Sequence, residues 1–391
     1  MSLGELGLTD ASVPGVALIG DGDRLWQILA EAGERLIDRG YLRYKPGTSL
    51  VAGLRLASGH AFAYAVGAAA AAKPRKTVDR APEGSVLCWS PANGLLIARA
   101  GADRDLPGVL RPDRLAAALP EGVRAARWET LAYKPQRRWV ARPFESGRAL
   151  PYVVRAYRRN DLPRALAGWD LATEVAARGA GLVLPRILVR ARRGGIATTS
   201  WLPGAPLDRL LAGGPVDTEL LVRVGDQLAR LHAGLPARPG DGVAGRLRAA
   251  RAVLREVAAV LPDHRARAGE LLLSLTARAP EARLVRPIHG DFSADQVIVG
   301  PDGSVGLTDW DRGGWGDPAT DLGSLRAAGL PEDGYAAVLA GYTAVRDLPE
   351  AVDWHTAVTR LLRLTEPLRQ CRVEWRTEIQ ARLAALEESV A

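Results

Sequence analysis

Residues 288–297 read Ile-His-Gly-Asp-Phe-Ser-Ala-Asp-Gln-Val, and this stretch decides how the rest of the chain is interpreted. Asp291 is followed five residues later by the side-chain amide of Gln296, and an apolar run ends in Asp309, eighteen residues after Asp291. Between them, Asp302-Gly303 predicts a hairpin turn that joins two short strands. We therefore expect one loop and one strand end to bring Asp291, Gln296 and Asp309 together around a metal ion.

A second acidic motif follows in residues 316–322, Gly-Asp-Pro-Ala-Thr-Asp-Leu. Asp317 is placed to cap the start of a helix, with Asp321 one turn further on. Burying so many carboxylates among Ile, Val, Leu and Trp is costly unless a cation or donors compensate. A base, an amide and a carboxylate at this spacing are what phosphoryl transfer to a hydroxyl requires. The alternatives are a buried polar loop without activity and a metal-dependent hydrolase, whose usual dinuclear site is poorly served by one nearby His.

As a set, these motifs resemble the aminoglycoside phosphotransferase and choline kinase superfamily, closely over residues 283–325 and more loosely over residues 130–235. The resemblance implies an α+β, bilobal protein-kinase-like fold with a small β-rich N-lobe and a largely helical C-lobe. It also implies a small-molecule O-phosphotransferase, a kinase that uses ATP or GTP with Mg²⁺ and transfers the γ-phosphate to a hydroxyl of its acceptor.

Roles for single residues follow from the same resemblance. Asp291 would be the catalytic base, and His289 would orient its loop. Gln296 and Asp309 would bind Mg²⁺, and Asp311 would assist with a second metal ion. Gln296 departs from the Asn that is more common in the family, and its extra methylene moves the metal ligand.

The nucleotide side of the predicted site is less regular. Arg155 stands where the family usually has a phosphate-binding Lys, and Glu174, on a predicted helix from residue 162 to 178, would be its partner. Trp201 and Leu202 lie in a Trp-Leu-Pro-Gly turn that ends the N-lobe, next to the nucleotide. A guanidinium holds phosphates but does not replace an ammonium group equivalently. Arg155 therefore also leaves open a pseudokinase-like module that binds nucleotide without turnover.

The chain divides into three predicted parts. Residues 1–125 form an N-terminal cap unit, residues 126–205 the kinase-like N-lobe and hinge, and residues 206–391 the helical C-lobe with the catalytic loop and the acceptor-binding helices. The cap unit is β-rich, begins with an amphipathic helix that carries Leu25 to Ile37, and resembles the cap of maltokinases and glucosamine kinases. In the C-lobe, a helix over residues 220–231 is expected, with His232 at its end as a partner of the helix dipole.

An internal repeat links the first two parts. Tyr-Lys-Pro occurs at residues 44–46 and again at residues 133–135, and the similarity extends over residues 44–67 and 133–155. With a one-residue slip, Tyr64 aligns with Tyr152. Each copy is expected to form a strand, a turn that contains Gly and a second strand.

The composition excludes several classes of protein. The net charge is +8, with 24 Lys and Arg against 15 Asp and Glu in residues 1–160 but 11 against 18 in residues 281–391. The arginines are scattered among alanines without interleaved aromatic residues, so no nucleic-acid partner is expected. No signal peptide is recognised, and no apolar run reaches the roughly 20 residues that span a bilayer, so we expect a cytoplasmic protein without a membrane partner. Cys88 and Cys371 predict neither a disulfide nor a metal site. Both a monomer and a homodimer are compatible with the sequence.

The acceptor is the least determined part of the prediction. Family members phosphorylate antibiotics, sugars, choline or homoserine, and their acceptor pocket usually lies in the C-terminal helices. The candidate residues are Asp295, Trp354, Arg360, Arg363, Glu366 and Trp375. An arginine-rich pocket suits a sugar or a neutral or acidic antibiotic better than a polycationic aminoglycoside. Antibiotic self-resistance and sugar phosphorylation of the maltokinase or glucosamine kinase type both remain open, and the spacing of Arg360, Arg363 and Glu366 is equally typical of a solvated, ion-paired helix face.

Overall fold

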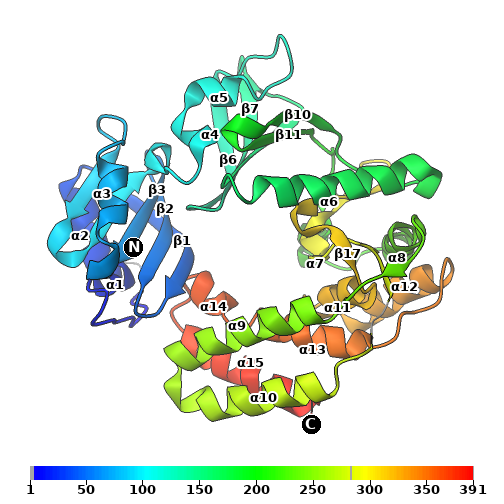
Figure 1. Cartoon of the computed structure of the whole chain (residues 1–391). Coiled ribbons are helices and arrows are strands. Elements are labelled where there is room, and N and C mark those ends of the chain that lie inside the picture. Colours follow the sequence, from blue (N-terminus) through cyan, green and yellow to red (C-terminus); the bar gives the residue numbers. More distant parts are fainter. Residues whose placement is uncertain (1–3, 282–283, 391) are drawn as a thin grey trace.

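The computed structural model describes residues 4–281 and 284–390 and contains two antiparallel sheets followed by a mainly helical region (Figure 1). The first sheet has the strand order β1-β2-β3-β5-β4. Its elements are α1 (Gly15–Gly20), α2 (Gly22–Glu31), β1 (Leu36–Lys45), β2 (Ser49–Leu56), β3 (Gly59–Val66), α3 (Ala72–Val78), β4 (Val86–Ser90) and β5 (Leu95–Arg99). The amphipathic helix expected to reach Ile37 ends at Glu31, because the chain turns at Gly33, where φ is 73°, and continues as β1.

The second sheet has the strand order β10-β11-β9-β7-β6, with β8 paired to β7. Two short helices lead into it, and α6 connects β9 to β10. The elements are α4 (Pro107–Leu110), α5 (Pro112–Ala116), β6 (Arg127–Lys134), β7 (Arg138–Glu145), β8 (Arg148–Ala149), β9 (Tyr152–Tyr157), α6 (Leu162–Val175), β10 (Ile187–Ala191) and β11 (Ile196–Ser200). Apart from the two-residue strand β8, this sheet has five strands with α6 after the third, and it forms the small β-rich N-lobe that was expected.

The remaining chain is largely helical and carries short strand pairs around the catalytic-loop sequence. Its strands are β12 (Ala205–Pro206), β13 (Arg238–Pro239), β14 (Leu284–Ile288), β15 (Val297–Val299), β16 (Val305–Leu307) and β17 (Gly314–Gly316). Its helices are α7 (Leu207–Gly213), α8 (Thr218–Ala233), α9 (Ala244–Val260), α10 (Arg265–Ala277), α11 (Ala319–Ala327), α12 (Glu332–Thr343), α13 (Val352–Leu362), α14 (Glu366–Arg369) and α15 (Trp375–Val390). The predicted α+β, bilobal kinase-like fold is confirmed.

The two sheets repeat one topology. When the strands of each sheet are numbered along the chain, leaving out β8, they lie side by side in the order first, second, third, fifth, fourth. Ser49 and Arg138 are equivalent, because each opens the second strand opposite the Lys of a Tyr-Lys-Pro turn. Two residues further along the second strand, Val51 pairs with Tyr64 and Val140 pairs with Arg155 on the third strand. Tyr64 is therefore equivalent to Arg155. The sequence alignment of Tyr64 with Tyr152 was therefore wrong, because the excursion through β8 lengthens the second copy between its second and third strands.

Two hydrophobic clusters connect the first sheet to the rest of the molecule. One face of the first sheet, with residues such as Leu50 and Ile97, is covered by α1 and α2 and belongs to one hydrophobic cluster with helices α9, α10, α13 and α15. Its other face packs, through Phe62 and Leu96, against Trp139 and Ala156 of the second sheet. In Figure 1 the first sheet lies at the left, the second sheet at the top and the C-terminal helices at the lower right.

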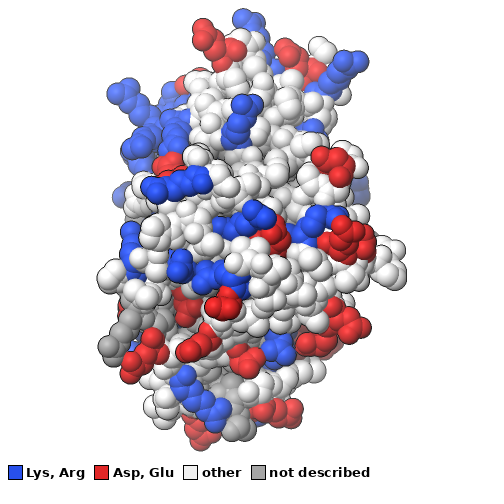
Figure 2. Space-filling view, turned by 90° about the vertical axis from the view of Figure 1, so that its right-hand side faces the viewer, with Lys and Arg blue, Asp and Glu red and all other residues white. Residues whose placement is uncertain are grey.

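The charge asymmetry of the sequence is visible on the surface. On the face in Figure 2, Lys and Arg gather over the upper part of the molecule, and Asp and Glu are more frequent in the lower part. Within the described ranges, no helix is long and apolar enough to cross a membrane.

Candidate active site

The catalytic-loop sequence directly follows β14 and is held by the first turn of α11. The carboxylate of Asp321 accepts hydrogen bonds from the backbone N–H groups of His289, at 2.6 Å, and Gly290, at 2.8 Å. Gly290 has φ of 78°, and a Cβ atom there would collide with the carbonyl oxygen of Arg312. Glycine is therefore required between His289 and Asp291 for the loop to pass this close to its neighbour.

His289 lies beneath this loop. Its ring is fully buried between Phe292 and Trp310, and its Nε2 is 2.7 Å from the carbonyl oxygen of Thr308, to which it donates. The ring thus ties the loop to the end of strand β16. This position suits the orienting role expected for His289.

Asp321 is itself fixed by His232 and Tyr342. Nε2 of His232 lies 3.1 Å from the Asp321 carboxylate, and its Nδ1 lies 2.9 Å from the Tyr342 hydroxyl. Burial would raise the pKa of Asp321, but the hydrogen bonds from His232 and from the His289 N–H hold it below its usual value, while burial lowers the pKa of His232. An ionised Asp321 therefore accepts from a neutral His232. The expectation that His232 serves the helix dipole was wrong, because its side chain is fully buried and engaged with Asp321.

A similar pair forms at Asp317. The Asp317 carboxylate accepts from the Ala319 N–H at the start of α11, as the predicted cap requires, and from Nε2 of His355 at 3.2 Å. His355 is also bonded to Thr320, and its carbonyl oxygen accepts from Arg246 on α9. Burial lowers the pKa of Arg246 to about 10, against the charges of Asp321, Asp317 and Asp291. Arg246 therefore joins α9 to α13 next to the acidic residues of the site.

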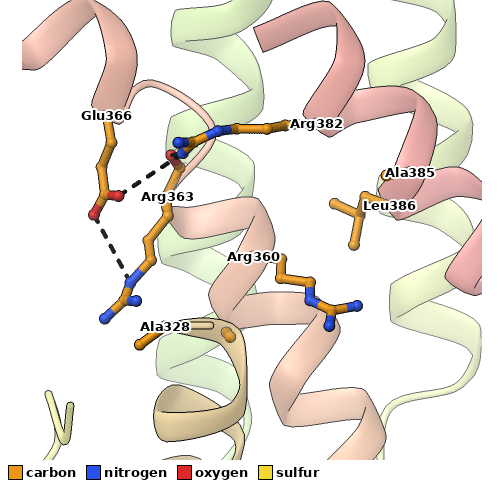
Figure 3. Close-up of a pocket in the computed structure, with 8 residues that line it drawn as sticks. Ala328, Arg360, Arg363, Glu366, Arg382, Ala385 and Leu386 are labelled. Atoms are coloured by element: carbon orange, nitrogen blue, oxygen red, sulfur yellow. Dashed lines mark hydrogen bonds and ion pairs between the residues drawn. The ribbon is translucent and has the colours of Figure 1, made fainter. Parts of the chain in front are cut away.

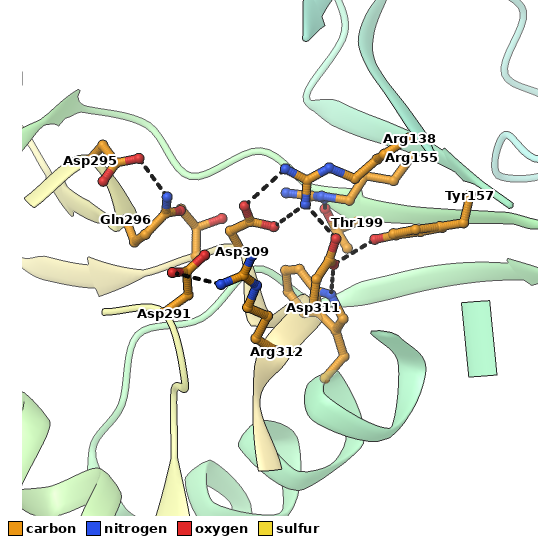
Figure 4. A network of polar contacts seen from close by, with 12 residues as sticks. Arg138, Arg155, Tyr157, Thr199, Asp291, Asp295, Gln296, Asp309, Asp311 and Arg312 are labelled. Atoms are coloured by element: carbon orange, nitrogen blue, oxygen red, sulfur yellow. Dashed lines mark hydrogen bonds and ion pairs between the residues drawn. The ribbon is translucent and has the colours of Figure 1, made fainter. Parts of the chain in front are cut away.

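Arg138 joins the two lobes across the site. Its guanidinium binds Asp309, with N–O distances of 2.7 and 3.2 Å, and also binds Asp311 (Figure 4). Burial would lower the pKa of Arg138, but the charges of Asp309 and Asp311 raise it above its usual value. Conversely, burial would raise the pKa of Asp309, but Arg138 and then Arg155 lower it. Asp309 is held with φ of 60°, a left-handed conformation that is uncommon outside glycine and is frequent at functional sites.

Asp291 and Gln296 flank Asp309 (Figure 4). The Asp291 side chain is 41% exposed and accepts from Arg312 at 3.2 Å. The backbone N–H of Thr308 donates to the backbone carbonyl of Gln296 where the two strands meet. The side-chain amide of Gln296 donates to Asp295. The structure therefore brings together Asp291, Gln296 and Asp309, as the spacing predicted.

The donor set suits one Mg²⁺ better than two. Amide and carboxylate oxygens, which Gln296 and Asp309 supply, are the ligands that Mg²⁺ prefers, and the guanidinium on Asp309 already occupies a cation position. Asp311 instead accepts from Tyr157 at 2.7 Å and from Trp169 at 3.3 Å, as well as from Arg138. Its side chain belongs to the contact between the lobes. Among the residues described, no group of three or more His, Cys, Asp or Glu could hold a metal ion.

The residues expected on the nucleotide side separate into two groups. Arg155 is buried, donates to Thr199 at 2.9 Å and lies 5.0 Å from the centre of the Trp169 ring. Glu174 does not pair with it: the Glu174 side chain is 52% exposed and bonds Arg178 one turn further along the same helix. The predicted Arg155–Glu174 pair was wrong, because α6 turns Trp169 rather than Glu174 toward β9.

Trp201 and Leu202 lie between β11 and β12, where the chain passes from one lobe to the other. The guanidinium of Arg142 stacks on the Trp201 ring at 3.9 Å, and the Trp201 N–H donates to the Pro151 carbonyl. Leu202 lies beside Gly306 of β16. Both residues occupy the predicted hinge.

The acceptor candidates do not form one surface. Asp295 lies in the catalytic loop, where it accepts from Ser293 and Gln296. Trp354 and Trp375 were wrong as acceptor contacts, because both are buried in the core and donate to the carbonyl oxygens of Leu275 and Leu6.

The other three candidates line a pocket of about 320 Å³ (Figure 3). Its lining residues are Ala327, Ala328, Arg360, Arg363, Glu366, Arg382, Ala385 and Leu386. Arg363 and Arg382 share Glu366, at 3.7 and 3.8 Å. Helix α11 begins beside the catalytic loop and α13 packs against it, and the pocket lies at the other ends of the two helices, about 10 Å along the axis of α11. The predicted single helix face is interrupted, since α13 ends at Leu362 and α14 begins at Glu366.

Several residues of the site were missed from the sequence. Arg138, Tyr157 and Trp169 all reach Asp311 from the second sheet and α6, over separations of 142 to 173 residues. No local spacing signals such contacts. The one available signal was the repeat, in which Arg138 follows the second Tyr-Lys-Pro turn.

Fold and site together define a bilobal phosphotransferase, with an acidic catalytic loop under a five-stranded lobe. A sequence model of the phosphotransferase enzyme family matches residues 144–357, which is more than half of the 391 residues. The chain belongs to this family.

Two solved structures agree on the fold. Amicoumacin kinase hAmiN, in complex with AMP-PNP, Ca²⁺ and Ami, has a TM-score of 0.52 at 13% identity, over 70% of this chain and 91% of its own. LicA in complex with AMP has a TM-score of 0.51 at 13% identity, over 71% and 96%. A choline/ethanolamine kinase family protein from Mesorhizobium loti is 20% identical, over 70% and 92%, with a TM-score of 0.48. A search among curated proteins gave no match.

Proposed function

We propose that this protein transfers the γ-phosphate of ATP or GTP, as a Mg²⁺ complex, to a hydroxyl group of a small molecule. The observation that carries the proposal is the convergence of Asp291, Gln296 and Asp309 next to Arg138 of β7. Membership of the phosphotransferase family supports the reaction type. A cytoplasmic location, where both nucleotides are available, fits this activity.

Asp291 is the proposed catalytic base. Its side chain is the most solvent-accessible carboxylate of the three that surround the proposed metal position, at 41% against 23% for Asp309 and 15% for Asp311. An acceptor hydroxyl can therefore reach it and pass its proton to the carboxylate as phosphoryl transfer proceeds. His289 and Asp321 keep the loop in place and do not contact the acceptor.

Gln296 and Asp309 are the proposed ligands of Mg²⁺, which would neutralise the nucleotide phosphates. Arg155 and Arg138 supply cations from the second sheet, and Trp201 and Leu202 border the nucleotide at the hinge. Two structural neighbours contain adenine nucleotides or an analogue, which supports ATP as one donor. Since Arg138 occupies Asp309 in this structure, metal and nucleotide binding must release it from that carboxylate.

The acceptor is proposed to be an antibiotic or a sugar, neutral or acidic overall. Outside the N-lobe, Arg312 bonds the proposed base at 3.2 Å and Arg246 lies within reach of its charge, and a polycationic aminoglycoside would meet both cations. Antibiotic self-resistance by O-phosphorylation is one role that this acceptor class would serve. Phosphorylation of a sugar, as in maltokinases and glucosamine kinases, is the other.

A nucleotide-consumption screen tests the proposal. The purified protein is incubated with MgATP or MgGTP and a panel of sugars and of nucleoside, peptide and macrolide antibiotics, and nucleoside diphosphate is measured. We expect acceptor-dependent turnover in the wild type and a loss of at least about 10²-fold in Asp291→Asn, which keeps the shape of the side chain but not the base. Undiminished turnover in this variant would refute the role of Asp291.

A non-catalytic nucleotide-binding module is the second candidate, favoured by the ion pair between Arg138 and Asp309. In that case nucleotide would bind without Mg²⁺, and no acceptor would stimulate turnover. Calorimetric titration with ATP in EDTA and in MgCl₂ separates the two functions, because the phosphotransferase requires the metal for tight binding.

A further inference from the structure

A buried carboxylate outside the catalytic lobe holds the turn that carries Arg138. Asp103 lies between β5 and α4, and its side chain is 1% exposed. One carboxylate oxygen accepts from the Tyr133 hydroxyl at 3.0 Å and from the Gln136 N–H at 2.7 Å. The other accepts from the Asp105 N–H at 3.2 Å. Asp103 thus fixes both ends of the Tyr133–Gln136 turn, directly before Arg138.

The first copy of the repeat contains the same arrangement. Asp10 accepts from the Tyr44 hydroxyl at 2.8 Å and from the Gly47 N–H at 2.7 Å through one oxygen, and from the Ser12 N–H at 2.9 Å through the other. Tyr44 and Gly47 are equivalent to Tyr133 and Gln136 in the topology described above. The two aspartates therefore make three matching hydrogen bonds each.

The sequences around the two aspartates also match. Residues 10–16 read Asp-Ala-Ser-Val-Pro-Gly-Val, and residues 103–109 read Asp-Arg-Asp-Leu-Pro-Gly-Val. In each copy the glycine packs closely against the turn between the fourth and fifth strands, Gly15 at Asn93 and Leu95, Gly108 at Gly194 and Ile196. The aspartate, the Pro-Gly helix start and the Tyr-Lys-Pro turn are thus one structural unit that occurs twice.

The two copies differ in what the turn carries. Where the second copy has Arg138 and Arg155, the first has Ser49 and Tyr64. Only the second copy therefore presents cations to the carboxylates of the site.

The two turns differ at the residue that follows Tyr-Lys-Pro, which is Gly47 in the first copy and Gln136 in the second. Gly47, with φ of 69°, adopts the left-handed conformation freely, whereas Gln136 adopts φ of 60° against the preference of a residue with a side chain. The Gln136 N–H is one of the groups that Asp103 binds. The second turn thus depends on its aspartate more than the first does.

We propose that Asp103 is a positioning residue for phosphoryl transfer: it holds the Tyr133–Gln136 turn so that Arg138 is aimed at Asp309 and, once nucleotide is bound, at its phosphates. This inference rests on the proposed function and deepens it. Asp103 touches neither nucleotide nor acceptor and acts through the turn. Asp10 binds the equivalent turn of the first copy in the same way, but Ser49 stands there in place of Arg138.

The chain therefore offers its own control. Asp103→Asn and Asp10→Asn each keep the side-chain volume and remove one acceptor and the charge from equivalent positions. Affinity for MgATP and MgGTP is measured by isothermal titration calorimetry on the full-length protein, together with thermal unfolding. We expect Asp103→Asn to weaken nucleotide binding about tenfold, because donors of the turn lose their acceptor, and Asp10→Asn to change it less than about twofold.

Tyr133→Phe and Tyr44→Phe form a second, milder pair in case Asp103→Asn does not fold. Each removes a single hydroxyl that donates to the equivalent aspartate. Binding weakened threefold or more in Tyr133→Phe and unchanged in Tyr44→Phe would support the inference.

The remaining outcomes count against it in distinguishable ways. If the wild type binds nucleotide and the variants of the second copy bind equally well, Asp103 is not a positioning residue. Equal weakening in both copies would assign the effect to general stability and also overturn the inference. If the wild type binds neither nucleotide, the proposed function fails and the inference fails with it.

Discussion

Replacing Arg138 with Met tests whether this arginine takes the place of a bound cation. The change keeps an apolar stem of similar length but removes the guanidinium from Asp309 and Asp311, whose side chains are 23% and 15% exposed. Leaving these carboxylates without their cation should cost about 3 kcal/mol of unfolding free energy, the low end of the range for a broken buried pair. At roughly 2 °C per kcal/mol for a chain of this size, Tm should fall by about 6 °C in EDTA.

Mg²⁺ should reverse the effect selectively. In Arg138→Met the ion can reach Asp309 without displacing a guanidinium, so a Mg²⁺ concentration ten times Kd should recover about 1.4 kcal/mol. The wild type should gain much less, because Arg138 competes for the same carboxylate. Differential scanning fluorimetry in EDTA and in MgCl₂ measures both shifts.

Arg137→Met is the matched control, since Arg137 is exposed and adjacent to Arg138 in the same turn. It should leave Tm and the Mg²⁺ response unchanged. The reasoning is refuted if Arg138→Met has the wild-type Tm in EDTA, or if Mg²⁺ stabilises the variant and the wild type equally.

Three further predictions address the loop, the nucleotide side and pH. Asp321→Asn should lower turnover at least tenfold and destabilise the fold by about 2 kcal/mol, because a buried acceptor of three donors loses its charge; steady-state rates and urea unfolding measure both. Glu174→Ala should leave nucleotide affinity within twofold of the wild type in calorimetry, since Glu174 pairs with Arg178 on the outer face of α6. Burial raises the pKa of Asp103 to about 6 from 3.8, so its contribution to stability is greatest below pH 4 and is lost as pH rises to about 6. The wild type should therefore lose up to about 3 kcal/mol relative to Asp103→Asn between pH 4 and pH 6.5, measured as the difference in unfolding free energy.

The local part of the site was predictable from the sequence, and the contacts between lobes were not. Asp291, Gln296 and Asp309 lie within 19 residues, and one turn and one strand pair bring them close together. Arg138 meets Asp309 over 171 residues, and this contact depends on how two separately built lobes pack. The roles of these residues in catalysis stay predictions.

Errors arose where the face of an element had to be known. Glu174 lies on the predicted helix, but Trp169 occupies the face that turns toward Arg155, because a large aromatic side chain is stabilised by burial and a carboxylate is not. His232 was expected to serve the dipole of the helix that it ends. Its burial follows from Asp321, a partner 89 residues away.

The duplicated sheet explains how an N-terminal unit without catalytic residues can still bear on the chemistry. Its own turn ends in Ser49 and its third strand carries Tyr64, so it has no cation to offer a nucleotide. One of its faces shares a hydrophobic cluster with α1, α2 and the C-terminal helices, and the other packs against the second sheet, so it contacts both lobes around the site. Asp103 follows its last strand after three residues and binds the turn that carries Arg138, so a short stretch of chain joins the first sheet to that turn. The first copy is thus connected to the site through the second copy, although it presents no cation to the site itself.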